Sequence, residues 1–323
     1  MKLSALNDPK HKISRQFSAL QQYKDHGFAY PLTTEIDLTW RCALNCKGCH
    51  SKWLHQDMEL KPNEISRILS QLKEHGCKSV VWSGGGEPLE SPYWHGAIMK
   101  ADIEGFSQGL YSYFPEPSQH KVDFLEYYMD FVYSHNFKTE GLKRGSKRHP
   151  TGNVWTAGYL LDKDNYLKIP RFIDQVDLDF FDYVDFRPLI LEGETDYRWV
   201  ANALELFNAL EDMYSAEMLK KAKYAEYKFR DLLRPDFGRT YGTCVSTDFV
   251  AVVGPDGTLW ECVNRRGKTP LGNLLKESLS EIWSRKDHCR TEFEGCRILC
   301  RNNEMNKELD YLLGPSPRHE LFV

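Results

Sequence analysis

The sequence lacks any long apolar run. No stretch approaches the roughly 18–20 apolar residues that a membrane-spanning helix needs. The first twenty residues, MKLSALNDPKHKISRQFSAL, contain no continuous apolar segment of the kind found in a secretory signal peptide. An excess of one charge is missing too, because 42 basic residues face 46 acidic ones. These absences predict a cytoplasmic protein, with no reason to expect nucleic acid or a membrane as its partner.

Internal repeats, low-complexity segments and long linkers are also missing. The 323 residues are 41% hydrophobic, which suffices for one large domain or for a large and a small one. Nine cysteines are an odd count in a chain without an export signal. A disulfide framework is therefore disfavoured, and metal-binding or catalytic thiols are the better interpretation.

Strand and helix patterns alternate along the first two thirds of the chain. Residues 33–39 (TTEIDLT) and 78–82 (KSVVW) read as strands around a helix that has Asn63 as its N-cap and ends at Gly76. Further strands are expected at 108–114, 130–134, 154–161 and 182–190, and helical segments at 91–105, 122–129, 169–176 and 197–233. This order predicts an α/β fold, a partial (β/α)6 TIM-type barrel with parallel strands.

The character of the sequence changes near Tyr241. FVAVVGPDGTLWEC reads as a β-hairpin with a Pro-Asp-Gly turn, and five cysteines accumulate around and after it. We therefore expect a small C-terminal domain. The expected divisions are an N-terminal helical extension at 1–32, the barrel at 33–240, the cysteine-rich domain at 241–305 and a tail at 306–323.

Three cysteines follow the first expected strand in CALNCKGCH, at Cys42, Cys46 and Cys49. A structural zinc site needs four ligands, so three thiolates on one loop suit a metal centre with an open position. A zinc knuckle with His50 as fourth ligand is the alternative, but it leaves SGGGEPLE at 83–90 unexplained. That glycine-rich loop follows the second strand, and neighbouring strands lie about 4.8 Å apart, so we expect the two loops to face each other.

Together these motifs resemble those of the radical S-adenosylmethionine superfamily. The resemblance implies that Cys42, Cys46 and Cys49 bind three irons of a 4Fe–4S cluster, whose fourth iron is chelated by S-adenosylmethionine. It also implies cofactor contacts from Gly84, Gly85, Gly86 and Glu87 to the methionyl ammonium, and from Ser134 to the ribose. Gly48 departs from the family, which often has an aromatic residue just before the third cysteine.

The C-terminal cysteines resemble those of the SPASM and twitch auxiliary-cluster domains. The resemblance implies one auxiliary 4Fe–4S cluster held by Cys244, Cys262, Cys296 and Cys300, because a full SPASM domain with two clusters needs more cysteines. Cys289 would then replace one of these ligands, donate a hydrogen atom to a substrate radical, or be a small buried residue. A four-cysteine zinc site is the alternative for the whole domain.

An enzyme of this family cleaves S-adenosylmethionine to a 5′-deoxyadenosyl radical that abstracts hydrogen from its substrate. With about 32 residues before the barrel, we expect no leader-peptide domain and therefore a small polar substrate, such as a sugar or aminocyclitol oxidised at a carbinol. The alternatives are a redox-neutral epimerase using Cys289, a peptide-modifying enzyme, or a zinc-binding interaction module.

Flavodoxin or ferredoxin is the expected electron donor, and the catalytic base is not identified. The basic loop 138–149 is either solvated surface or a guide for a substrate phosphate or carboxylate.

Overall fold

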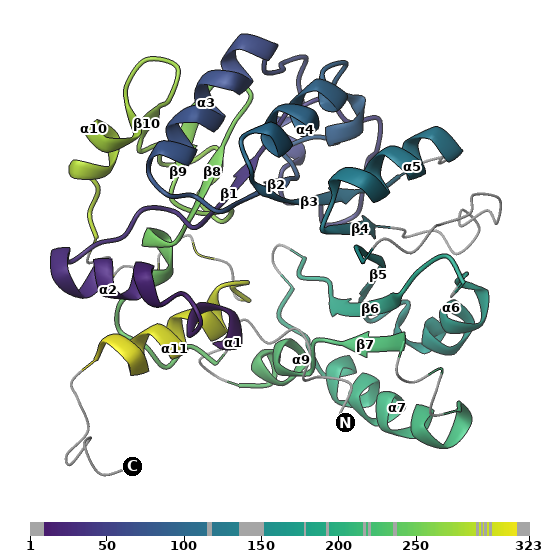
Figure 1. The fold of residues 1–323 in the computed structure, drawn as a ribbon. Helices are drawn as coiled ribbons and strands as arrows, with labels where there is room; N and C mark the ends of the chain where they lie inside the picture. The colour runs from purple at the N-terminus through teal and green to yellow at the C-terminus, as the bar shows by residue number, and fades with distance from the viewer. Residues whose placement is uncertain are drawn as a thin grey trace.

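A single curved sheet organises the protein. The computed structural model describes residues 10–114, 118–135, 152–177, 179–191, 194–215, 218, 221–234, 238–288, 291, 293, 296 and 299–314. Within these ranges the strands form one sheet in the order β10-β9-β8-β1-β2-β3-β4-β5-β6-β7 (Figure 1). The middle of this order follows the chain, which is the arrangement of successive βαβ units.

Six central strands are parallel to one another, which confirms the predicted α/β barrel fold. They are β1 (Thr33–Ile36), β2 (Ser79–Trp82), β3 (Ser107–Ser112), β4 (Phe131–His135), β5 (Val154–Leu161) and β6 (Tyr183–Pro188). The helices that follow or precede them are α3 (Pro62–Glu74), α4 (Trp94–Ile103), α5 (Gln119–Tyr128) and α6 (Ile169–Gln175). These helices lie along the outside of the curved sheet (Figure 1). Pro62 begins α3, so the helix starts one residue before the expected cap, Asn63.

The two faces of the barrel strands differ in chemistry because successive side chains point to opposite sides. Toward the helices, the strands contribute Ile36, Trp82, Leu110, Val132, Ala157 and Val184 to the main hydrophobic core. The opposite, inner face carries polar and aromatic side chains instead, among them Glu35, Tyr111, Tyr133, Asp185 and Arg187. The apolar face therefore supplies stability, and the inner face is left for chemistry.

The stretch 197–233 is not one long helix, and that expectation was wrong. It contains α7 (Trp199–Met213), the short strand β7 (Ala222–Tyr224) and α9 (Glu226–Leu232). Its composition favours helix, but β7 pairs in parallel with β6 and extends the sheet, so tertiary pairing overrides the local propensity. Among the described helices, none combines the length and the apolar character needed to cross a membrane.

The C-terminal hairpin joins the barrel sheet directly. After the short helix η4 (Val245–Asp248), β8 (Val250–Val253) and β9 (Thr258–Trp260) pair antiparallel, and β10 (Gly272–Asn273) pairs with β9. The turn between β8 and β9 contains Gly257 at φ +79°, where a Cβ atom would lie 2.4 Å from Cγ of Leu275. Because β8 is also parallel to β1, the C-terminal segment continues the sheet at its first strand.

The described ends of the chain pack together. Helices α1 (Lys10–Ile13) and α2 (Phe17–His26) share a second small core with α11 (Asn303–Leu313), built on Ile13, Ala19, Leu20, Phe249 and Leu309. Helix α10 (Leu279–Ser284) begins with a capping box, in which Ser278 and Glu281 each bind the backbone N–H of the other. The segment expected as a tail from residue 306 thus begins inside α11.

A fully buried ion pair joins η4 to the end of α10. Nζ of Lys286 lies 2.7 Å from Oδ1 of Asp248, and neither side chain has any exposed surface. Nδ1 of His288 lies 2.5 Å from the same oxygen. Breaking one partner of such a pair leaves a charge in an apolar environment, which is far more costly than losing an exposed pair.

We expect Lys286→Met to lower the free energy of unfolding by about 3 kcal/mol, because it removes the buried ammonium and leaves His288 as the remaining side-chain partner of the Asp248 carboxylate in the described part of the chain. Arg285→Met is the matched control, since Arg285 makes a half-exposed pair with Glu277 and should cost less than about 1 kcal/mol. Urea unfolding of the two variants and the unchanged protein measures both values. Equal losses would contradict this account of the buried pair.

Candidate cluster and cofactor site

The three cysteines of the first motif lie on one loop beyond β1. Cys42, Cys46 and Cys49 are each partly buried, and the backbone N–H of Cys49 donates to the carbonyl of Cys46 at 3.2 Å. Burial raises the pKa of the Cys42 thiol to about 11, and the nearby Glu90 and Glu87 carboxylates add to this effect. Burial also raises the pKa of the Cys46 thiol, and the neighbouring Cys49 makes a smaller contribution in the same direction.

These thiols are neighbours on the loop but are not drawn together into a closed ligand set. Within the described ranges, no group of three or more His, Cys, Asp or Glu side chains is close enough to hold a metal ion. Their donor chemistry nevertheless fits an iron–sulfur centre, because soft thiolates are its usual ligands and the side chains remain partly accessible. Metal binding to such a loop would replace thiol protons, and ligand assignment to these residues stays a prediction.

Gly48 explains the departure from the family pattern in this loop. Its φ is +72°, and a Cβ atom would lie 2.8 Å from Cδ1 of Leu189 and 2.9 Å from Cδ2 of Leu191. A side chain before the third cysteine would therefore adopt a strained left-handed backbone conformation and would have to displace the two leucine side chains of the segment after β6. An aromatic residue at this position would push the loop away from that segment.

The glycine-rich loop after β2 packs directly on the chain that leads into the cysteines. A Cβ atom on Gly86 would lie 2.2 Å from the carbonyl oxygen of Arg41, and one on Gly85 would lie 2.2 Å from Cδ1 of Trp40. The N–H of Glu87 donates to the carbonyl of Arg41 at 2.8 Å. The structure thus places the two motifs against each other, and glycine is required because the backbones touch.

The Glu87 carboxylate is buried and held by three donors. Oε1 accepts from the Ser112 hydroxyl at 2.6 Å and from the Leu89 N–H at 3.1 Å, and Oε2 accepts from the Tyr113 N–H at 3.0 Å. Burial raises the pKa of this carboxyl to about 7. Glu87 therefore ties the glycine loop to the end of β3, a role that its sequence motif does not indicate. Its expected contact with the methionyl ammonium stays a prediction.

Ser134 lies one strand further along the sheet. It is buried on β4 and pairs in register with Ser112 on β3, the residue that binds Glu87. Ser134 and the glycine loop therefore belong to the same end of neighbouring strands, where ligands of parallel sheets bind. The ribose contact expected for Ser134 stays a prediction.

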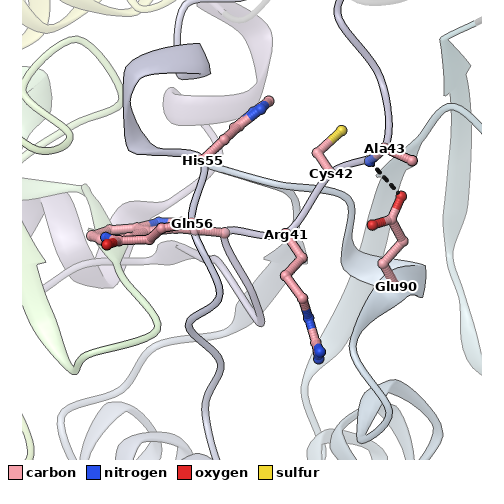
Figure 2. Close-up of a pocket in the computed structure, with 7 residues that line it drawn as sticks. Arg41, Cys42, Ala43, His55, Gln56 and Glu90 are labelled. Carbon is pink, nitrogen blue, oxygen red and sulfur yellow. Dashed lines mark hydrogen bonds between the residues drawn. The ribbon is translucent and has the colours of Figure 1, made fainter.

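A pocket opens beside the first cysteine. Figure 2 shows Cys42 at this pocket with His55 across from it, while the Arg41 side chain points away. The backbone N–H of Ala43 donates to Oε1 of Glu90 at 2.9 Å, which fixes the loop on the short helix η2 (Pro88–Glu90). The pocket is lined by Trp40, Arg41, Cys42, Ala43, His55, Gln56 and Glu90.

Arg266 connects the C-terminal segment to both motifs, and sequence reasoning missed it. Its Nη2 lies 2.9 Å from Oε2 of Glu35 and 3.1 Å from Oδ1 of Asp37. Its Nη1 donates to the Gly84 carbonyl at 3.2 Å and lies 3.4 Å from Nε2 of His50. A guanidinium beside the His50 imidazole disfavours a zinc ion there, which argues against the zinc-knuckle alternative. The only sequence signal was a basic residue near Cys262.

The C-terminal cysteines lie within electrostatic range of one another. Burial raises the pKa of Cys262 to about 12, with further contributions from Cys300 and Cys244, and that of Cys300 to about 11, with contributions from Cys244 and Cys296. The expected set of four is thus brought to one region, although no closed set is formed among the described residues. Cys289 lies outside the described residues, as does the basic loop 138–149.

Asparagine side chains surround these sulfurs, a feature that the sequence did not reveal. Nδ2 of Asn306 donates to Sγ of Cys244 at 3.5 Å, and Nδ2 of Asn264 donates to Sγ of Cys300 at 3.7 Å. The backbone N–H of Asn302 also donates to Sγ of Cys300 at 3.4 Å. Donors aimed at sulfur stabilise thiolate charge and tune iron–sulfur centres, so they suit the expected auxiliary cluster.

Comparisons with known proteins agree with this geometry. Residues 244–308 match the family model of SPASM, an iron-sulfur cluster-binding domain. SuiB of Streptococcus suis bound to its precursor peptide SuiA has a similar structure, with a TM-score of 0.63 and 15% identity over 88% of this chain and 72% of SuiB. This chain has the radical S-adenosylmethionine enzyme fold with a C-terminal SPASM domain. The fold class and the SPASM-type C-terminal domain expected from the sequence are thereby confirmed.

Two further structures share this fold. SuiB bound to S-adenosylmethionine has a TM-score of 0.59 and 15% identity over 86% of this chain and 70% of SuiB. Native anSMEcpe with bound AdoMet and Cp18Cys peptide has a TM-score of 0.58 and 13% identity over 87% of this chain and 96% of anSMEcpe. No protein of curated function matches the sequence. The SPASM match confirms the iron–sulfur character of the expected cofactors. S-adenosylmethionine, the other expected cofactor, is bound in the two similar structures of this paragraph.

Gly86→Ala should lower the melting temperature by several degrees, because its Cβ would overlap the Arg41 carbonyl and separate the two loops. Gly96→Ala on α4 is the matched control. A Cβ atom there meets nothing within 4 Å, and alanine should stabilise the helix by about 0.5–1 kcal/mol. Calorimetric unfolding of both variants measures the difference. Two variants of equal stability would contradict the close packing of the loops.

Glu87→Gln should change how stability depends on pH. Because burial raises the pKa of Glu87 from 4.5 to about 7, the folded state binds more protons than the unfolded state between these values. The stability contribution of this carboxyl is therefore present below about pH 4.5 and is lost as pH rises through 7, by about 3 kcal/mol. Urea unfolding should show that, from about pH 5 to about pH 7.5, the unchanged protein loses free energy of unfolding that the variant keeps. A pH-independent difference would rule this out.

Proposed function

We propose that this protein is a radical S-adenosylmethionine enzyme that generates a 5′-deoxyadenosyl radical and abstracts hydrogen from a substrate at the inner face of the barrel. The contacts of Arg266 carry this proposal. Through Arg266, the SPASM domain reaches the first strand, the cysteine loop and the glycine loop together. A chain in which these parts served separate purposes would have no need for such a connection.

We infer from the motifs and from their positions which residues would hold the cofactors. Cys42, Cys46 and Cys49 would hold the first cluster, and Gly84, Gly85, Gly86, Glu87 and Ser134 would line the place of S-adenosylmethionine. Cys244, Cys262, Cys296 and Cys300 would hold one auxiliary cluster. When bound, the first cluster supplies the electron that cleaves the sulfonium. The glycine loop and the buried neighbours of Glu87 orient the cofactor and exclude water from it.

Oxidation of a small polar substrate is the reaction that we favour. Tyr111, Tyr133 and Asp185 give the inner face hydrogen-bonding groups suited to a hydroxylated molecule. In a carbinol oxidation the first electron would leave with the hydrogen atom that the 5′-deoxyadenosyl radical abstracts, a base would take the hydroxyl proton, and the auxiliary cluster would take up the second electron. A flavodoxin or ferredoxin would supply the separate electron that the first cluster needs to cleave S-adenosylmethionine. Thiolates and iron–sulfur centres of this kind suit the reducing cytoplasm, which is the compartment that we expect.

Modification of a peptide is the second candidate. It is supported by the similarity to SuiB bound to its precursor peptide and to anSMEcpe bound to a peptide. Epimerisation with Cys289 as hydrogen donor is a third outcome to be tested. In that case Cys289→Ala would lose product while still consuming S-adenosylmethionine, whereas an oxidase would keep its product.

Cys46→Ala tests the first cluster. Anaerobically reconstituted protein should contain about eight irons per chain, and the variant about four, because only the auxiliary cluster remains. Formation of 5′-deoxyadenosine under reducing conditions should fall at least about a hundredfold. Cys77→Ala is the control, since Cys77 is a buried core residue near Thr34 and should affect neither value. Full iron content in Cys46→Ala, or zinc in place of iron in the unchanged protein, would refute the proposal.

The substrate class is tested by deuterium transfer. Reduced enzyme is incubated with S-adenosylmethionine and with deuterated sugars or aminocyclitols in one series and with deuterated peptides in another. We expect deuterium in 5′-deoxyadenosine only from the small polar compounds, together with an oxidised product. Transfer from peptides alone would replace our preferred substrate class by the second candidate.

A further inference from the structure

Three cations from distant parts of the chain meet at the inner face of the barrel. Arg187 is on β6, Lys228 is on α9, and Arg301 follows the last cysteine of the SPASM domain. We call Arg187, Lys228 and Arg301 the inner-face cations. Their charges influence one another, since Arg187 and Arg301 both act on the ammonium of Lys228. Helix α9 packs against β6, which brings Lys228 to Arg187.

Arg187 is held in place by its neighbours. Its Nε lies 2.5 Å from Oδ2 of Asp185, and its Cζ lies 4.3 Å from the centroid of the Tyr133 ring. The Tyr133 hydroxyl donates to the same Asp185 oxygen at 3.2 Å. A Cβ atom at Gly158 would lie 2.1 Å from Cε1 of Tyr133, so glycine on β5 makes room for this ring. A guanidinium fixed by stacking and one ion pair is preorganised for a further planar or tetrahedral anion.

The charges at this face do not balance. Arg266 pairs with Glu35 and Asp37, Arg301 also contacts Glu35, and Arg187 pairs with Asp185. Lys228 forms no ion pair with any residue that the structure describes, and its ammonium lies 5.8 Å from the Tyr227 ring centroid. Four cations therefore face three carboxylates. Among the residues that the structure describes, one basic side chain at this place is thus left without a carboxylate partner.

The environment of Lys228 shows the same deficit. Burial lowers the pKa of Lys228 to about 7, and repulsion from Arg187 adds to the effect more than attraction by Asp185 offsets it. His135 on β4 lies within the electrostatic range of Arg187. Burial lowers the pKa of His135 to about 3, and the positive charge of Arg187 adds a smaller lowering, so that the imidazole is neutral. An anion bound here would relieve the repulsion that the cations exert on one another.

The inner-face cations also remain accessible. The Arg187 side chain is 28% exposed and that of Arg301 is 44% exposed, whereas the Arg266 side chain is only 3% exposed. The guanidinium of Arg266 is therefore engaged in contacts within the protein, whereas Arg187 and Arg301 keep exposed surface that a ligand can contact. Two accessible guanidinium groups held in place by single carboxylates, next to an ammonium without an ion pair among the described residues, have the properties of an anion-binding site.

We propose that Arg187, Lys228 and Arg301 bind an anionic group of the substrate, a carboxylate or a phosphate. This inference rests on the proposed function and narrows it to substrates that carry such a group. The three residues would act by binding and orienting. Because Arg301 directly follows Cys300, an anion held there would be fixed between the barrel strands and the SPASM domain.

The test uses inorganic phosphate and malonate as probes for the two anions. Each is titrated calorimetrically into reconstituted enzyme saturated with S-adenosylmethionine, so that the carboxylate of the cofactor already occupies its own site. We expect saturable binding of one anion per chain, and the stronger of the two probes identifies the substrate group. Lys228→Met should weaken this binding about tenfold, because a charge-assisted contact is lost. Lys228→Arg should retain it.

Lys100→Met is the matched control. Lys100 is on α4, on the helix-covered outside of the barrel, where it pairs with Glu104, and its loss should change anion affinity less than about twofold. Lys228 has no ion pair among the described residues, so Lys228→Met leaves no carboxylate unpaired and should fold; Arg301→Gln provides an independent variant with the same expected weakening.

Three results would overturn the inference. These are absence of saturable anion binding, equal affinity in Lys228→Met and Lys100→Met, and a loss of S-adenosylmethionine affinity in Lys228→Met with anion binding unchanged. The last result would assign the cations to the cofactor carboxylate. Iron content and 5′-deoxyadenosine formation are measured in the same samples. If they persist while anion binding fails, the substrate class is wrong and the proposed function stands.

Discussion

The structure depends on one buried guanidinium. Arg266 is surrounded by Glu35, Asp37, the Gly84 carbonyl and His50, and almost none of its side chain is exposed. Two carboxylates this close could not both be buried without it, and burial already raises the pKa of Asp37 to about 6. Because Arg266 comes from the SPASM domain and its partners come from the barrel, this contact and the pairing of β8 with β1 together set the relative position of the two cysteine groups.

Close backbone packing gives the candidate site its shape. Gly48, Gly86 and Gly158 each stand where a Cβ atom would overlap another part of the chain. Gly86 brings the glycine loop onto the chain that leads into the cysteines, and Gly48 lets the cysteine loop pack on the segment after β6. Gly158 makes room for the ring that supports Arg187. The positions of the functional side chains are therefore fixed by the scaffold before any ligand binds, which lowers the cost of ordering them.

The two cysteine groups lie in different electrostatic surroundings. Burial raises the thiol pKa in both groups, but the smaller contributions differ. Glu87 and Glu90 raise the pKa of Cys42 further, whereas N–H groups of Asn306 and Asn302 directed at Cys244 and Cys300 offset part of the rise there. An iron centre on the first loop would have to displace thiol protons in a region of negative charge, and its own positive charge would offset that cost. The donors around the second group would help to hold its charge without further rearrangement.

The sequence by itself determined the features that depend on local pattern. The alternating strands, the loop spacing of Cys42, Cys46 and Cys49, and the hairpin at 250–260 follow from periodicity and turn chemistry, which act over a few residues. Only the tertiary structure decided that β7 interrupts the expected helix, that β8 joins β1, and that Arg266 and the inner-face cations reach their partners. These features bring together residues up to 266 positions apart, and the free energy of such contacts comes from packing and charge in the folded state.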